Sequence, residues 1–281
     1  MEIIDFNEIT RYNDWPTRLI NQHDLVIKKK SRNEILREFG KEKWYQINQL
    51  IEKIKNPDIN KIEEIINDNN KIVSFYKGNF YTCSKKEIDD LYLKIFEKTL
   101  LKYINEVDCI VELGAGYGSK ILNIANNETF KNKKFIAGEI TLEGQIAISK
   151  IATHMGLEID VGFCDISKGE YEDLKIPKNS LIFTSYSTHY TRKLKKEVYQ
   201  KLLNLNPFII IHFEPIYEIY NDGNLHDLMC KKYIEINDYN TNLLEVLNEL
   251  ENDRMIRFNI QKNIIGSNPF LPISIIDCKL I

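Results

Sequence analysis

The stretch Cys109-Ile-Val-Glu-Leu-Gly-Ala-Gly-Tyr-Gly118 places three glycines at alternate positions directly after an apolar run. Residues 108–113 are largely apolar and β-branched around Glu112, a composition that predicts a buried parallel strand. An apolar helical pattern over 118–126 follows at once. A strand, a glycine turn and a helix bring backbone N–H groups up against a ligand, and a Cβ in the turn would block that approach. The stretch therefore predicts a ligand-binding turn.

The glycine spacing narrows the kind of ligand. A dinucleotide fingerprint has the spacing G-x-G-x-x-G, whereas this chain has Gly114-x-Gly116-x-Gly118 with Glu112 two residues before the first glycine. That E-x-G-x-G-x-G string resembles motif I of the class I S-adenosylmethionine (SAM) dependent methyltransferases. The resemblance implies that the glycine turn contacts the methionine and ribose part of SAM. It also implies that Glu112 lies near the methionine amino group.

Two further acidic residues follow predicted strands. Residues 134–139 form a second predicted strand that ends in Glu139, about 20 residues past the glycines, where a carboxylate accepts hydrogen bonds from a ribose diol. A third predicted strand at 159–164 ends just before Asp165. In the family that the chain resembles, an acidic residue at this place often meets the adenine amino group. Glu139 and Asp165 are therefore candidate SAM ligands.

From residue 105 onward, predicted strands and helices alternate. The strands are expected at 108–113, 134–139, 159–164, 180–186, 208–213, 254–261 and 272–281, and the helices at 118–126, 142–155, 192–204 and 239–251. Such alternation predicts a doubly wound α/β sheet, and the last two strands read as a hairpin. The resemblance implies seven mainly parallel strands with the last one antiparallel. Residues 105–281 are thus expected to form a Rossmann-like SAM-binding domain.

The region before that domain, residues 1–104, is expected to form a helical cap that carries substrate contacts. Two Ser-x-x-Glu capping boxes, at 31–34 and 84–87, predict helix starts. The three lysines at 28–30 predict a solvated turn.

An aromatic segment at 75–81, a loop or a short hairpin, lies just before the predicted core. Its Tyr76 and Tyr81 are candidate substrate contacts at one wall of the site. The alternative is that these rings only pack between cap and core, as buried aromatic side chains commonly do.

Composition excludes several classes of function. The net charge of −3 gives no electrostatic case for nucleic acid as a partner. The longest apolar runs, such as 207–213, are too short to cross a bilayer, and the first residues lack the pattern of a secretion signal. The five cysteines are scattered without a C-x-x-C pair, so no metal site is expected, and reduced thiols indicate a cytoplasmic protein. Whether the chain forms a homodimer is left open.

The catalytic candidates follow the fourth and fifth predicted strands, because ligands of open α/β sheets bind outside the carboxyl ends of the strands. Residues 183–190 are rich in hydroxyls. Here Ser185 is a candidate SAM contact, His189 a candidate general base and Tyr190 a candidate substrate contact. Two of them have a purely structural alternative, a strand-end cap for Ser185 and a hydrogen-bonding histidine for His189.

The second stretch, 211–218, places Glu214 at the exit of the fifth predicted strand. A carboxylate there is costly unless it faces a polar cleft, so Glu214 is a candidate base. His212 lies within the strand and is expected to point into the core or onto the sheet face.

These features predict a metal-free SAM-dependent methyltransferase acting on an oxygen or nitrogen of a small molecule or peptide. The Asn/Asp-Pro-Pro-aromatic string of the family's amine-methylating DNA enzymes is missing at 184–187. Two alternatives remain. One is an aminopropyl-type transferase of the same fold, which the lack of paired acidic residues at 184–187 disfavours. The other is a non-catalytic SAM-binding partner subunit.

Overall fold

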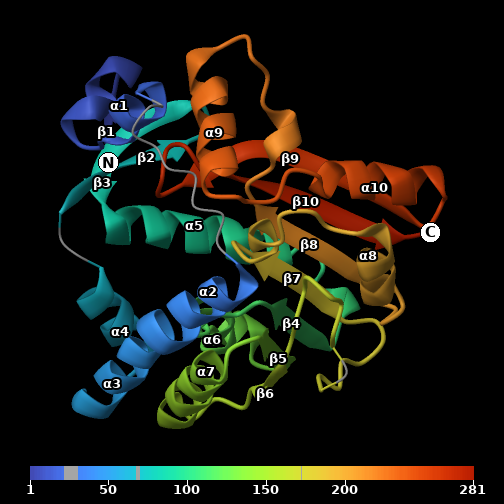
Figure 1. Ribbon diagram of the computed structural model, residues 1–281. Coiled ribbons are helices and arrows are strands. Elements are labelled where there is room, and N and C mark those ends of the chain that lie inside the picture. Colours follow the sequence, from blue (N-terminus) through green and yellow to red (C-terminus); the bar gives the residue numbers. More distant parts are fainter. Residues whose placement is uncertain (22–30, 68–69, 172) are drawn as a thin grey trace.

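The computed structural model describes residues 1–21, 31–67, 70–171 and 173–281. The turn expected at 28–30 lies outside these residues. The chain folds around one mixed β-sheet with helices on both faces (Figure 1).

The strands are β1 (Glu2–Ile4), β2 (Lys71–Tyr76), β3 (Asn79–Ser84), β4 (Cys109–Leu113), β5 (Lys134–Glu139), β6 (Asp160–Phe163), β7 (Leu181–Ser185), β8 (Ile209–Glu214), β9 (Ile256–Gly266) and β10 (Ile273–Leu280). The main helices are α1 (Trp15–Ile20), α2 (Arg32–Leu36), the π-helix η3 (Arg37–Trp44), α3 (Tyr45–Lys53), α4 (Ile59–Ile66), α5 (Lys85–Leu100), α6 (Ser119–Ala125), α7 (Leu142–Met155), α8 (Lys196–Leu203), α9 (Leu225–Ile236) and α10 (Leu243–Asn252). Short 3-10 turns are η1 (Phe6–Arg11), η4 (Ile104–Glu106), η5 (Glu128–Phe130), η6 (Thr188–Tyr190) and η7 (Tyr217–Ile219).

The sheet has the strand order β1-β3-β2-β9-β10-β8-β7-β4-β5-β6. Strands β6, β5, β4, β7 and β8 run parallel to one another. Strand β10 runs antiparallel to both β8 and β9. All seven expected strands are present, and the expected reversal of the last one is confirmed. The expected total of seven strands is wrong, because the sheet formed by the described residues has ten strands.

The three additional strands come from the region that was expected to be a helical cap. β2 and β3 form a hairpin at the aromatic segment, and β2 pairs with β9, so the N-terminal region extends the main sheet. The hairpin turn is Lys77-Gly78, with φ angles of 47° and 86°. Two positive φ angles suit the right-handed twist of a hairpin, and the second is easy for glycine. The expectation of a helical cap apart from the sheet is therefore wrong, whereas the hairpin expected as one option at 75–81 and both predicted capping boxes are confirmed.

Two apolar layers enclose the sheet. On one face, Phe96 of α5 packs against Phe183 and Phe213, with ring centroids 4.9 and 4.5 Å apart. On the other face, α8 and α10 bury Leu202 and Leu247 against the sheet. Strands β4 and β8 are buried at every position, which explains their nearly continuous apolar sequences.

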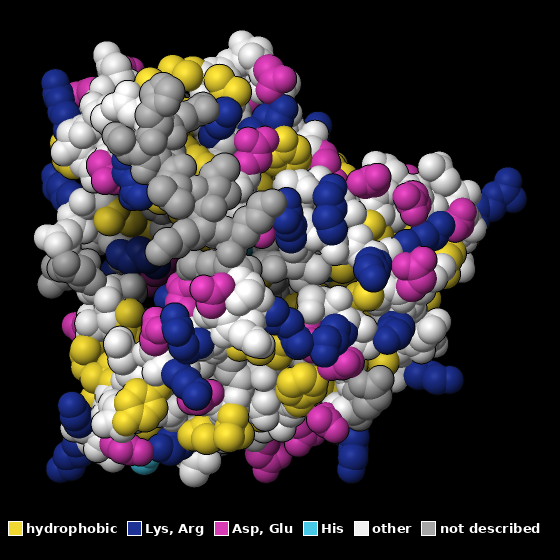
Figure 2. Space-filling view, viewed as in Figure 1, with side chains coloured by type: hydrophobic (Ala, Val, Ile, Leu, Met, Phe, Trp, Pro, Cys, Tyr) yellow, Lys and Arg dark blue, Asp and Glu magenta, His cyan; other side chains and the backbone are white. Residues whose placement is uncertain are grey.

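In the surface view of Figure 2, Lys and Arg side chains are interspersed with Asp and Glu. No helix of the described residues is long and apolar enough to span a membrane.

Candidate active site

A cavity of about 320 Å³ lies at the carboxyl ends of β4 and β7, between the glycine turn and α5. Its volume is near the lower end of the range for small-molecule sites, about 300–1,000 Å³. Its lining includes Phe39, Trp44, Glu63, Asn67, Lys85, Asp89, Tyr92, Glu112, Gly114, Ala115, Gly116, Tyr117, Ser119, Lys120, Ser185, Tyr186 and Tyr190. The position at the strand ends is the one that the sequence predicts.

The glycine turn has the geometry that only glycine adopts readily. Gly114, Gly116 and Gly118 have φ angles of 74°, 60° and 87°. The N–H groups of Gly114 and Ala115 donate to the Gly138 carbonyl oxygen at 2.8 and 2.9 Å, which fixes the turn to β5. A Cβ added at Gly114 would lie 2.4 Å from the Cβ of Ser187. The turn is thus tightly packed, as its sequence predicts.

Glu112 closes one end of the cavity. Its carboxylate accepts a hydrogen bond from the Ile121 N–H at 2.9 Å. Burial raises the pKa of Glu112 to about 8, and the nearby charge of Glu139 adds to the rise, although the Ile121 N–H and the charge of Lys120 oppose it. The side chain is therefore protonated at neutral pH in this structure. A cationic ligand beside it would favour the ionised form.

Glu139 lies beneath the glycine turn and is not part of the cavity lining. One carboxylate oxygen accepts from the Thr141 N–H and hydroxyl at 2.9 and 2.7 Å, and the other accepts from the Gly116 N–H at 2.9 Å. In this arrangement Glu139 stabilises the turn. Its contact with ribose stays a prediction.

Asp165 is buried and forms an ion pair with Arg32 of α2. It also accepts hydrogen bonds from the N–H and hydroxyl of Ser167, at 3.0 and 2.6 Å. The contact with adenine expected for Asp165 stays a prediction, because Arg32 occupies this carboxylate here.

Residues 32–53, which comprise α2, η3 and α3 and are called the covering segment below, lie across the loops that follow β4, β5 and β6. Trp44 contacts Gly116, since a Cβ added at Gly116 would lie 2.9 Å from the Trp44 ring. The ring centroids of Trp44 and Tyr117 are 5.2 Å apart. Asn48 donates to the Glu143 carbonyl oxygen at 2.8 Å. Figure 1 shows α3 alongside α7. The covering segment thus closes the end where a nucleoside is expected.

The loop after β7 forms another wall. The Ser185 hydroxyl lies 2.7 Å from that of Tyr92, and both residues line the cavity. Burial raises the pKa of Tyr92 well above its usual value, so this phenol stays protonated. Tyr186 has an unusual φ of 49° and donates to the Leu271 carbonyl oxygen at 2.9 Å. Ser185 and Tyr190 both line the cavity. Their contacts with SAM and with the substrate stay predictions.

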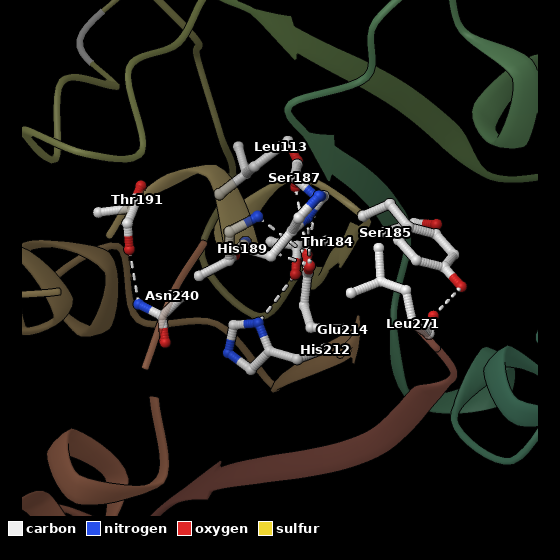
Figure 3. A network of polar contacts seen from close by, with 12 residues as sticks. Leu113, Thr184, Ser185, Ser187, His189, Thr191, His212, Glu214, Asn240 and Leu271 are labelled. Atoms are coloured by element: carbon white, nitrogen blue, oxygen red, sulfur yellow. Dashed lines mark hydrogen bonds and ion pairs between the residues drawn. The ribbon is translucent and has the colours of Figure 1, made fainter. Parts of the chain in front are cut away.

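His189 and Glu214, the two catalytic candidates, are adjacent (Figure 3). Neither lines the cavity, and the rings of Tyr186 and Tyr190, which do, pack against His189. Glu214 accepts from the N–H groups of Ser187 and Thr188, both at 3.0 Å, and lies 3.3 Å from His189 Nδ1. Burial alone would raise the pKa of Glu214, but His189 and these N–H groups outweigh it and lower the pKa. The pair fixes the loop after β7. Its catalytic role stays a prediction.

His212 points away from the cavity, as expected. Its Nδ1 lies 2.9 Å from the Thr184 hydroxyl and its Nε2 lies 2.8 Å from that of Tyr199. Burial lowers the pKa of His212 to about 4, although the charge of Glu214 opposes this. The imidazole is thus neutral in the folded protein.

The buried His212 predicts a loss of stability in acid. An unfolded histidine titrates near 6.5, so the stability from His212 is complete above pH 6.5 and is lost as the pH falls toward 4, by about 3 kcal/mol in total. Urea unfolding at pH 7.5, 6.5 and 5.5 measures this slope. In His212→Gln the slope should be smaller, whereas it should persist in His154→Gln, which changes an exposed histidine. An unchanged slope in His212→Gln would contradict the prediction.

The other two substrate candidates, Tyr76 and Tyr81, lie on the β2–β3 hairpin with centroids 6.5 Å apart, and neither lines the cavity. The structure instead brings Trp44, Tyr92 and Lys120 to it. Of these, only Lys120 carried a usable sequence signal, since it lies two residues after the last glycine of the turn. Among the described residues, no group of three or more His, Cys, Asp or Glu side chains is arranged to hold a metal ion.

The glycine turn after β4, the parallel strands β4 to β8 and the reversed β10 form a Rossmann-like α/β fold. No family model and no curated protein matches the sequence. Similar solved structures include PigF with S-adenosylhomocysteine (SAH), at 18% identity and a TM-score of 0.45, covering 63% of this chain but only 53% of PigF. The plantazolicin methyltransferase BpumL with a desmethyl analogue and SAH has 12% identity and a TM-score of 0.49 and covers 70% and 91% of the two chains. An O-methyltransferase from Bacillus cereus with SAH has 12% identity and a TM-score of 0.47, and the match covers 85% of this chain and 99% of that enzyme. These distant likenesses concern the fold alone.

Proposed function

We propose that the chain is a SAM-dependent methyltransferase that moves a methyl group to an oxygen or nitrogen of a small molecule or peptide. The observation that supports this best is the cavity at the carboxyl ends of β4 and β7, which has the glycine turn and Glu112 in its wall. A glycine turn at this edge of the sheet lets a ligand approach the backbone closely.

The residues fit SAM at its amino-acid end. Glu112 would hold the ammonium group, and Gly114 and Gly116 would lie against the neighbouring part of the molecule. At the nucleoside end, Glu139 and Asp165 would contact ribose and adenine only after the covering segment moves away from Gly116. When bound, SAM supplies an electrophilic methyl group on a sulfonium.

The remaining work of the protein is to position the acceptor and exclude water, since methyl transfer is an in-line displacement. Tyr92, Ser185 and Tyr190 lie where an acceptor would meet the methyl group. The Tyr92–Ser185 hydroxyl pair can donate to or accept from an acceptor oxygen or nitrogen. The covering segment, closed again, would keep water from the site.

Calorimetry with SAM and SAH, followed by a tritiated-methyl transfer assay against small-molecule and peptide fractions of a cell extract, tests this proposal. The expected result is saturable binding of both compounds and transfer of label. Binding without transfer to any fraction would favour the non-catalytic partner subunit. A chain that binds neither compound is not a SAM-dependent enzyme.

The raised pKa of Glu112 predicts that SAH affinity increases with pH. Below pH 8 the carboxyl must lose its proton before it can pair with the ligand ammonium, so Kd should fall by up to about tenfold per pH unit between pH 6 and 8. Of the charged groups around Glu112, Lys120 lowers its pKa and Glu139 raises it. Calorimetry at pH 7 in buffers of different ionisation enthalpy should show release of about one proton.

The control for this prediction is Glu112→Gln, which should release no proton and show a flat profile. Glu128→Gln, at an exposed glutamate, should behave like the parent chain. A flat profile in the parent chain would contradict the assignment of Glu112.

A further inference from the structure

Lys120 is a cationic side chain at the cavity for which nothing above gives a role. It lines the same cavity as Glu112 and is the second residue after the glycine turn. Its Nζ lies 4.9 Å from the centroid of the Tyr92 ring and 3.4 Å from the Ser119 hydroxyl. No carboxylate among the described residues forms an ion pair with it. Its charge therefore lacks an anionic partner in the described part of the chain.

The other lysine of the cavity differs in this respect. Lys85 forms an ion pair with Asp89 one helical turn away, and both side chains belong to α5. Its charge is thus neutralised within the protein. Of the two lysines, only Lys120 has its charge available for an anionic group of a ligand.

The surroundings of Lys120 hold its side chain in place. The face of the Tyr92 ring attracts an ammonium group, and the Tyr92 hydroxyl is itself fixed by Ser185 at 2.7 Å. Lys120 also acts electrostatically on Glu112. One end of the cavity thus presents the carboxyl group of Glu112 and the ammonium group of Lys120, which interact electrostatically.

We propose that Lys120 binds the α-carboxylate of SAM while Glu112 binds its α-ammonium group. This inference rests on the proposed function and adds a cofactor-binding residue to it. An amino-acid end carries both charges on one carbon, so it is recognised best by neighbouring groups of opposite sign. A charge-assisted hydrogen bond from an ammonium to a carboxylate is about twice as strong as a neutral one.

The test compares two ligands that differ only at the amino-acid end. SAH carries that end, whereas 5′-methylthioadenosine has the same nucleoside and a thioether without it. In calorimetry, Lys120→Met should weaken SAH binding by about 10- to 100-fold and change methylthioadenosine binding by less than about twofold. Lys120→Arg should recover part of the SAH affinity. Lys85→Met, at the paired lysine, should leave the ratio of the two affinities unchanged.

Methylthioadenosine binding also reports whether Lys120→Met is folded. An equal loss for both ligands would show a structural role for Lys120 and overturn the proposal. Unchanged SAH affinity with a raised KM for the acceptor would assign Lys120 to the acceptor and overturn it as well. A parent chain that binds neither ligand would overturn the proposed function itself, and the role of Lys120 with it.

Discussion

Gly116→Val should remove SAH binding, with an increase in Kd of more than about 100-fold. Gly116 has a φ of 60°, a region in which a β-branched residue is strained by about 1–3 kcal/mol. The added Cβ would lie 2.9 Å from the Trp44 ring, and the two methyl groups beyond it would take up space at the cavity wall. Calorimetry with SAH measures the loss.

Gly156→Val is the matched control for Gly116→Val. Gly156 ends α7 with a φ of 68°, and a Cβ added there meets nothing within 4 Å. This variant carries similar backbone strain without crowding a site, so it should lose stability and keep its SAH affinity. If Gly116→Val, folded by circular dichroism, bound SAH as tightly as Gly156→Val, the glycine turn would not be the binding site.

Glu214→Ala should destabilise the protein by several kcal/mol, since each buried hydrogen-bond donor left without an acceptor costs about 1–3 kcal/mol. The change would orphan the N–H groups of Ser187 and Thr188 and remove the partner of His189. Urea unfolding measures the loss.

Glu214→Gln should lose less stability than Glu214→Ala, because its amide oxygen still accepts from the two N–H groups. Glu128→Ala, at a fully exposed ion pair, should leave the stability almost unchanged. A Glu214→Ala protein as stable as Glu128→Ala would show that Glu214 does not hold the loop after β7.

The catalytic role predicted for the same pair needs a separate measurement. If His189 is the general base, His189→Ala should lose turnover while SAH affinity stays within about twofold, as for a group that acts only in the transition state. Because His189 does not line the cavity, this outcome also requires the loop after β7 to move. Normal turnover in a stable His189→Ala protein would refute the catalytic assignment.

The sequence predicts the parallel half of the sheet well because its signals are local. Buried parallel strands are nearly continuous apolar runs, and β4 and β5 are followed within a few residues by the glycine turn and by the Thr141 helix cap. The β2–β3 hairpin was harder to recognise, since its Lys77-Gly78 turn lacks the Asn-Gly or Asp-Gly signal and its strands are rich in aromatic residues. Whether those rings lie in a sheet or on a cap depends on pairing with β9, almost 200 residues further along.

The residues of the candidate site likewise fall into those with a local sequence signal and those placed by long-range contacts. Glu112 and the glycines could be found from spacing within ten residues of sequence. The ion pair between Arg32 and Asp165 joins residues 133 positions apart, and the contact of Trp44 with Gly116 also joins distant parts of the sequence, so neither could be inferred from local patterns. Glu139 was recognised as important, but the hydrogen bond that it accepts from Gly116 of the turn depends on how β4 and β5 pair.

A crystal structure of the chain with SAH tests the central claim most directly. The proposed function predicts SAH against the glycine turn, its amino-acid end beside Glu112 and its ribose at Glu139, with Trp44 displaced from Gly116. SAH bound elsewhere, or a saturated crystal in which Trp44 still packs on Gly116 and the cavity holds no ligand, would contradict it.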